Sequence, residues 1–181
     1  MLEKEKKMKK GLIVIDMQND FIDGALGTKE AQAIVPNVVR LIGEGGWDDI
    51  MVTQDTHYDN YLDTLEGKKL PVKHCIAGTH GWFLNNDVLN ALQQVPLRYA
   101  DFDKNTFGSI RLAEYVRDEK FDEIVISGLC TDICVASNAL MIRAYNPDLI
   151  IKVKADCCAG VTPETHDAEL KTMQMCQIDV I

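Results

Sequence analysis

Short apolar runs without alternation recur along the chain, and stretches with helical periodicity separate them. Such runs are typical of strands buried on both faces of a parallel sheet. The pattern predicts strands at residues 11–16, 50–53, 97–101, 123–127, 149–153 and 178–181. It predicts helices at residues 33–44, 87–94, 109–120, 132–145 and 163–176. We therefore expect a three-layer α/β/α, Rossmann-like fold with a six-stranded, mostly parallel sheet.

The length of 181 residues suits one domain with a sizeable core. Residues 1–10 are expected to form a charged N-terminal extension, and residues 11–181 a single domain. The extension resembles neither a signal peptide nor a transit peptide. Residues 54–86 contain no long periodic pattern, and a loop of this length is expected to be functional rather than a mere connection.

The charge balance limits the classes of partner. The net charge is −9, and no basic block follows the first ten residues. Nucleic acid and anionic membranes are therefore not expected as partners. The chain has six cysteines. Because no secretory signal accompanies them, we expect reduced thiols and a cytoplasmic location.

Reactive side chains follow the predicted strands at their carboxyl ends. They are Asp16, Asp55, His57, Lys104, Cys130 and Cys134. In a parallel sheet these ends share one edge, where ligands bind. We therefore expect the functional site there.

The stretch Gly128–Val135 places Cys134 in the first turn of the helix that follows the fourth strand. The helix dipole and the unpaired N–H groups of that turn favour a thiolate, and the same groups can hold an oxyanion. A cysteine nucleophile also needs a cation near the sulfur and a group that moves protons. Lys104 and Asp16 supply these two parts.

With these residues in view, the chain resembles the isochorismatase-like cysteine hydrolases, the superfamily that includes the nicotinamidases. The matching segments are Ile15–Phe21, Thr53–His57, His74–Thr79, Lys104–Phe107 and Gly128–Val135. Each segment alone is a weak match, whereas their order and spacing together are specific.

The resemblance implies a role for each residue of a catalytic triad. Asp16 would be the general base and acid, Lys104 the electrostatic partner and Cys134 the nucleophile. The family commonly has a cis peptide at the position of Leu129–Cys130, which would aim the backbone N–H groups of Cys130 and Cys134 into one oxyanion hole. The presence of the cysteine implies C–N hydrolysis through a thioester.

The resemblance also implies a divalent metal, with Asp55, His57 and His74 as ligands. Many nicotinamidases have a further histidine in the loop between, which this chain lacks, so Glu66 is the candidate for the remaining ligand. This ligand set suits Zn, Mn or Fe. No organic cofactor is implied. Phe21 and Phe107 are expected to line the substrate pocket.

Nicotinamide, converted to nicotinate and ammonia, is the first substrate expected. Another small amide, or a ureido or N-carbamoyl compound, is the alternative, because Pro71 stands where many nicotinamidases have an aromatic residue. A thiol redox sensor, with Cys130 as resolving cysteine, is the non-enzymatic alternative. A redox sensor would not require Asp16 and Lys104 to lie near Cys134, whereas the hydrolase would.

Simpler structural roles also stay open. Cys134 could be a small core residue, Glu66 a surface residue, and His57 with Asp55 a hydrogen-bonded structural pair. Members of the family often assemble into dimers or larger forms, so a homo-oligomer is compatible with the resemblance.

Overall fold

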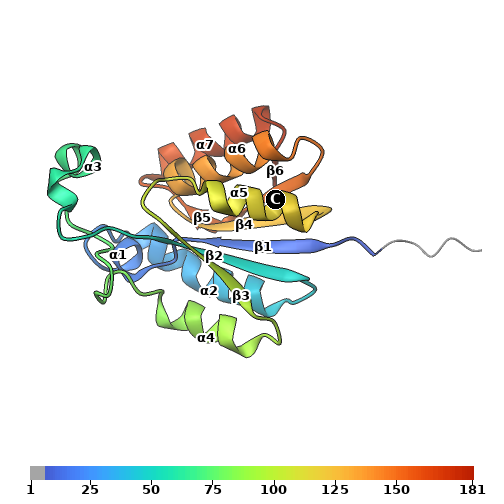
Figure 1. Ribbon diagram of the computed structural model, residues 1–181, viewed down its shortest axis with the longest axis horizontal. Coiled ribbons are helices and arrows are strands. Elements are labelled where there is room, and N and C mark those ends of the chain that lie inside the picture. Colours follow the sequence, from blue (N-terminus) through green and yellow to red (C-terminus); the bar gives the residue numbers. More distant parts are fainter. Residues whose placement is uncertain (1–6) are drawn as a thin grey trace, which may run out of the picture.

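The computed structural model describes residues 7–181. Its strands are β1 (Lys10–Ile15), β2 (Asp49–Asp55), β3 (Tyr99–Lys104), β4 (Glu123–Leu129), β5 (Ile150–Ala159) and β6 (Asp179–Val180). They form one sheet in the order β3-β2-β1-β4-β5-β6, and every neighbouring pair is parallel (Figure 1). The predicted sheet is confirmed.

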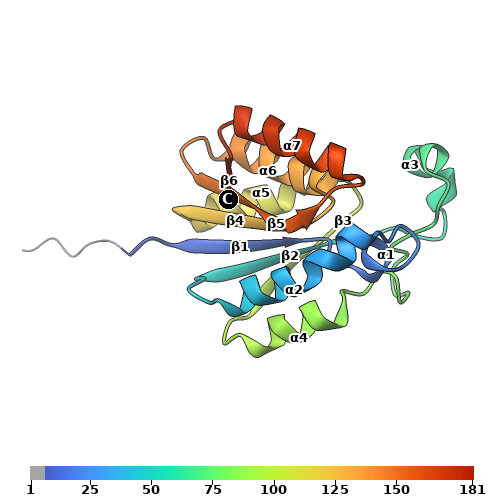
Figure 2. The same ribbon diagram turned by 180° about the vertical axis from the view of Figure 1, so that it is seen from behind.

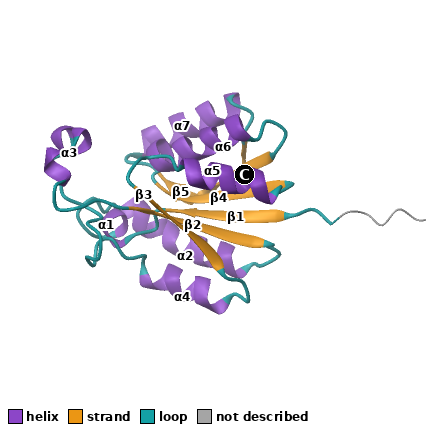
Figure 3. Ribbon diagram, viewed as in Figure 1, coloured by secondary structure: helices purple, strands orange, loops and turns teal. Residues whose placement is uncertain are grey.

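Helices cover both faces of the sheet, which confirms the three-layer fold. The helices are α1 (Asn19–Ile22), α2 (Lys29–Gly43), α3 (Leu65–Lys69), α4 (Asn86–Gln94), α5 (Ile110–Glu119), α6 (Ala136–Tyr145) and α7 (Pro163–Met175). A 3₁₀ turn, η1 (Tyr61–Asp63), and a π-helical turn, η2 (Thr131–Val135), complete the described elements. Helices α2 and α4 lie on one face, and α5, α6 and α7 lie on the other (Figure 3).

The sheet separates two apolar cores, and β1 contributes to both. Ile13 and Ile15 pack in the core beneath α5, α6 and α7. Leu12 and Val14 pack in the core beneath α2 and α4. Successive side chains of a strand point to opposite faces, so a strand covered on both sides must be apolar at every position. This explains the continuous apolar run in the sequence.

Several predicted element boundaries are wrong, and those of the first long helix and the fifth strand differ most. The first long helix begins at Lys29, not at residue 33, because the Thr28 side chain accepts a hydrogen bond from the N–H of Ala31 and caps it. Pro36 therefore lies inside the helix rather than in its first turn. Strand β5 continues six residues beyond the predicted end at residue 153, to Ala159, because it resumes its pairing with β4 after a register shift.

The segment predicted as one long loop, residues 54–86, contains η1 and α3. Seen from either side, α3 stands away from the layers at the end of the molecule where the strands finish (Figure 2). Strand β3 ends at Lys104, so this lysine is the last residue of the strand and not part of the loop that follows.

The predicted N-terminal extension lies outside the described residues at positions 1–6. Beyond them, Lys7 pairs with Asp48 at 2.7 Å and Lys9 with Glu119 at 2.7 Å. The boundary between extension and domain stays a prediction. None of the helices within residues 7–181 has the length and apolar character that a membrane crossing requires.

Gly128 lets β4 approach the end of β1, and this predicts opposite outcomes for one substitution at two glycines. Gly128 has a φ of +120°, and a Cβ there would lie 2.0 Å from the carbonyl oxygen of Ile15. Gly128→Ala is expected to destabilise the protein by about 3 kcal/mol or more. Gly43→Ala, at a helical site with nothing within 4 Å, is expected to stabilise it by about 0.5 kcal/mol. Urea unfolding of both variants measures the difference, and equal effects would contradict this account of Gly128.

Candidate active site

The order of the strands places a crevice between the carboxyl ends of β1 and β4. Successive connections run from β1 outward to β3 on one side, and from β4 outward to β6 on the other. Parallel sheets bind ligands where the direction of the connections reverses. Asp16 directly follows β1, and Cys130 directly follows β4. Both therefore lie at this point.

Three of the predicted side chains contact one another there. The Nζ atom of Lys104 lies 2.6 Å from Oδ2 of Asp16 and donates a hydrogen bond of 3.5 Å to Sγ of Cys134. All three residues are buried. The sequence separates these residues by up to 118 positions, yet the ends of β1, β3 and β4 bring them into one cluster.

Thr53 holds the carboxylate of Asp16. Its hydroxyl donates a hydrogen bond of 2.6 Å to Oδ1, and the N–H of Asp16 lies 3.2 Å from the Thr53 carbonyl oxygen. Asp16 has a φ of +45°, a conformation that is uncommon outside glycine and often found at functional sites. The sequence analysis missed Thr53. A hydroxyl residue at the end of the apolar run 50–53 is the signal that could have identified it.

The surroundings of the cluster shift the pKa values of Cys134 and Asp16. Burial raises the pKa of the Cys134 thiol, the charge of Asp16 raises it further, and Lys104 only partly opposes them, so this pKa lies well above its usual value. Burial also raises the pKa of Asp16, against the effect of Lys104. These surroundings favour the protonated form of the Cys134 thiol.

The backbone before Cys134 has the predicted form. The Leu129–Cys130 peptide is cis. The carbonyl of Cys130 accepts hydrogen bonds from the N–H groups of Ile133 (3.1 Å) and Val135 (3.0 Å), which forms the π-helical turn η2. The predicted helix after the fourth strand thus exists, and its first turn, with Cys134 in it, is wider than an α-helical turn.

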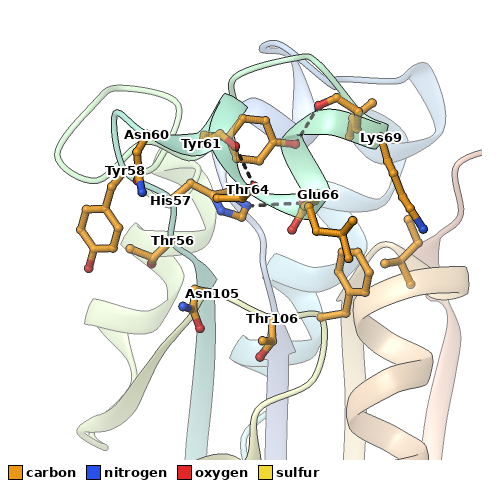
Figure 4. A pocket seen from close by; sticks show the side chains of 14 residues that line it. Thr56, His57, Tyr58, Asn60, Tyr61, Thr64, Glu66, Lys69, Asn105 and Thr106 are labelled. Atoms are coloured by element: carbon orange, nitrogen blue, oxygen red, sulfur yellow. Dashed lines mark hydrogen bonds and ion pairs between the residues drawn. The ribbon is translucent and has the colours of Figure 1, made fainter.

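The four residues predicted as metal ligands come together beside the cluster. One side-chain donor atom from each of Asp55, His57, Glu66 and His74 lies within 4.8 Å of the others. Nε2 of His57 is 2.9 Å from Oδ2 of Asp55. It is 3.5 Å from Oε1 of Glu66 (Figure 4). Nε2 of His74 is 3.5 Å from the same Asp55 oxygen.

The hydrogen bonding of the two imidazoles fits a divalent cation. Nδ1 of His74 lies 2.8 Å from the Val72 carbonyl oxygen, to which it donates, and this leaves the lone pair of Nε2 directed at the other ligands. Nε2 of His57 is buried and forms no hydrogen bond of acceptable geometry. Two imidazole nitrogens and two carboxylates suit Zn, Mn or Fe.

A cavity of about 300 Å³ opens onto Cys134 and onto three of these ligands, namely Asp55, Glu66 and His74. Phe21 and Phe107 both line it, as predicted. Its other walls, which the sequence analysis did not predict, are Leu26, Thr28, Ala31, Leu70, Leu129, Ile133, Gly160 and Val161, together with Cys130. Leu129 and Ile133 belong to the segment Gly128–Val135, which the sequence analysis singled out. The walls near α2 and in the loop after β5 carry no such signal in the sequence, because only tertiary packing brings them here.

A second cavity, of about 690 Å³, adjoins the first (Figure 4). The two share Glu66, Leu70, Phe107 and Ile133 as wall residues. Asn60, on the side of the η1 turn, and Asn105, on the loop after β3, lie on opposite sides of this outer cavity (Figure 4). The inner cavity, which Cys134 lines, therefore lies next to a wider outer cavity.

Comparison with known proteins agrees with this arrangement. The sequence profile of the isochorismatase domain matches residues 10–181. The chain belongs to the isochorismatase family. Within this family it is 25% identical to the nicotinamidase/pyrazinamidase of Mycobacterium tuberculosis over 184 residues, which cover 95% of this chain and 98% of that one.

Solved structures of the isochorismatase family show the same fold. The pyrazinamidase/nicotinamidase of Streptococcus mutans superposes with a TM-score of 0.83 at 30% identity, covering 96% of this chain and 100% of that one. The pyrazinamidase of Pyrococcus horikoshii, solved in complex with zinc, superposes with a TM-score of 0.76 at 25% identity, covering 96% and 98%.

The cluster of four predicted metal ligands allows a prediction for the loss of one imidazole. His57→Ala is expected to weaken the binding of Zn²⁺, Mn²⁺ or Fe²⁺ at least about 10-fold, because it removes a buried nitrogen donor. His80→Ala is the matched control, since that side chain is exposed and outside the cluster. Metal content after equilibrium dialysis measures both. Equal metal retention by the two variants would contradict the assignment of His57.

Proposed function

We propose that this protein is a cysteine amidohydrolase that cleaves the C–N bond of a small amide through a thioester on Cys134. The observation that carries the proposal is the buried contact of Asp16, Lys104 and Cys134, of which Cys134 lines the inner cavity. The nicotinamidases among the relatives make nicotinamide the first substrate, with nicotinate and ammonia as products.

In the first half of the proposed reaction, Asp16 takes the proton of the Cys134 thiol, and the sulfur attacks the amide carbonyl carbon. The backbone N–H groups of Cys130 and Cys134 hold the oxyanion of the tetrahedral intermediate. The C–N bond then breaks, and Asp16 passes its proton to the leaving nitrogen. Lys104 stabilises the negative charge as it moves between carboxylate and sulfur. The products of this half are ammonia and an acylated Cys134.

In the second half, Asp16 takes a proton from water while the water oxygen attacks the thioester carbonyl. The C–S bond breaks, the carboxylic product leaves, and the proton returns to the Cys134 sulfur. The raised pKa of the thiol supports this cycle, because the resting sulfur keeps its proton until the neighbouring base removes it.

The metal would lie at one wall of the same cavity. When bound by Asp55, His57, Glu66 and His74, a divalent cation supplies a Lewis acid that can hold a ring nitrogen of the substrate. The apolar lining, which includes Phe21, excludes water from the amide during the first half of the reaction.

A ureido or N-carbamoyl compound is the second candidate substrate. Pro71, which stands where many nicotinamidases have an aromatic residue, is exposed and does not line the cavity. Aromatic stacking from this position is therefore absent, and Phe21 and Phe107 are the aromatic side chains among the residues that line the cavity. The redox-sensor alternative is disfavoured, because Asp16 and Lys104 do lie beside Cys134.

We place the enzyme in the cytoplasm. All six cysteines are free, which is the usual state of thiols in a reducing compartment. Assembly into a homo-oligomer stays a prediction.

Removing the proposed nucleophile tests the reaction. Purified Cys134→Ala is expected to release ammonia from nicotinamide at least about a thousandfold more slowly than the wild type, because no thioester can form. Cys176→Ala, at an exposed cysteine after α7, is the matched control and should keep full activity. Turnover by Cys134→Ala would refute the mechanism. A folded wild type without turnover of nicotinamide would direct the assay to N-carbamoyl and ureido compounds.

Removing the proposed base is a separate test. Asp16→Asn keeps the shape of the side chain but cannot accept a proton, so kcat should fall about 10²- to 10⁴-fold. Asp103→Asn, on the exposed side of β3 next to Lys104, is the matched control. Steady-state kinetics with equal amounts of folded protein measure both. An unchanged kcat in Asp16→Asn would exclude Asp16 as the base.

A further inference from the structure

Glu66 differs from the other proposed ligands in its position in the fold. Asp55 is the last residue of β2, and His57 follows it by two residues. His74 is buried in the loop between α3 and α4. Glu66 lies on α3, which stands away from both helical layers and packs mainly against η1 (Figures 1 and 2). Packing against the two apolar cores therefore does not fix the position of Glu66, so another contact must fix it.

Tyr61, the first residue of η1, is in a position to do so. Its side chain is fully buried although the segment around it is at the surface. Its ring lies edge-on to the imidazole of His57, with 4.7 Å between centroids, and to that of His74, with 5.0 Å. The two imidazoles are themselves 4.8 Å apart. One aromatic ring thus packs against both proposed nitrogen ligands.

The polar groups of Tyr61 contact the residues that flank α3, the helix that carries Glu66. Its hydroxyl donates a hydrogen bond of 2.9 Å to the carbonyl of Leu70, directly after α3. Its carbonyl accepts hydrogen bonds from the Thr64 N–H (3.0 Å) and the Thr64 hydroxyl (2.6 Å), and this hydroxyl caps α3 at Gly67. Gly67 packs so close that a Cβ would lie 2.1 Å from the Tyr61 carbonyl oxygen. Tyr61 therefore fixes both ends of the short helix that carries Glu66 (Figure 4).

From these contacts we infer that Tyr61 is a positioning residue of the metal site. Tyr61 holds Glu66 close enough to the two imidazoles for all three side chains to bind one metal ion. The ring locates the imidazoles, and the hydroxyl locates the end of α3. Tyr61 itself does not bind the metal. This inference rests on the proposed metal site, and it assigns to Tyr61 a role that its burial alone does not require.

The test is a Co²⁺ titration of the metal-free full-length chain, followed by visible absorption. Tyr61→Phe keeps the ring and removes only the hydroxyl. It is expected to raise the Kd for Co²⁺ about 10-fold, the effect typical of losing a group that orients a ligand, and to change the Co²⁺ absorption spectrum. Tyr115→Phe is the matched control, because it removes a tyrosine hydroxyl bonded to Asp49 (2.5 Å), outside the ligand cluster. It should leave Kd and spectrum unchanged.

A double-mutant cycle tests whether the effect passes through Glu66. Glu66→Gln alone should weaken binding, and Tyr61→Phe added to it should cause little further loss, because the ligand that Tyr61 orients is already altered. If the two substitutions raised the Kd for Co²⁺ by independent factors that multiply, the effect of Tyr61 would not pass through Glu66, and the inference would be overturned.

Two further outcomes would also overturn the inference. One is a Tyr61→Phe protein that binds Co²⁺ like the wild type. The other is an equal loss in Tyr61→Phe and Tyr115→Phe with matching falls in Tm, which would indicate general destabilisation. A wild type that binds no Co²⁺ would reject the metal site itself, and with it the role of Tyr61, while leaving the Cys134 chemistry to its own assay.

Discussion

The ammonium of Lys104 and the carboxylate of Asp16 lie 2.6 Å apart where water does not reach. Removing such ions from water costs several kcal/mol each, which their attraction offsets only in good geometry with further hydrogen bonds. Thr53 and Cys134 supply these. Loss of either partner would leave a buried charge uncompensated. The ends of β1, β2, β3 and the turn after β4 are therefore held in one arrangement by a single polar cluster, and the proposed chemistry depends on that arrangement.

Asp55 extends this cluster toward the proposed metal ligands. Its Oδ1 is 3.8 Å from the Lys104 ammonium, and its Oδ2 faces His57 and His74. Burial raises the pKa of Asp55, but the two histidines beside it and the charge of Lys104 outweigh this effect, so the pKa lies below its usual value. The carboxyl groups of Asp55 and Glu66 both lie close to the imidazoles of His57 and His74. A divalent cation among the four side chains would join oxygen and nitrogen ligands that already face one another.

Much of this site could be predicted, and particular residues show why. Asp16, Lys104 and Cys134 each follow or end a strand whose apolar run is visible in the sequence, and parallel strands deliver such residues to one edge. Glu66 had no such support, since α3 is too short to produce a periodic pattern. The cap of α2 was misplaced because Pro36 gave a stronger local signal than Thr28. The burial that raises the pKa of the Cys134 thiol is set by packing and is not visible in the sequence around it.

The layered α/β/α fold, the family and the set of reactive side chains could all be read from the amino-acid sequence. These follow from the spacing of apolar residues and from residues adjacent to strand ends, which are local properties of a chain. The order of the strands, the walls of the two cavities, and the contacts of Tyr61 with both imidazoles and with α3 became visible only in the folded chain. Each of these is a distance between groups that are separate in sequence, and such distances are set by how the whole chain packs.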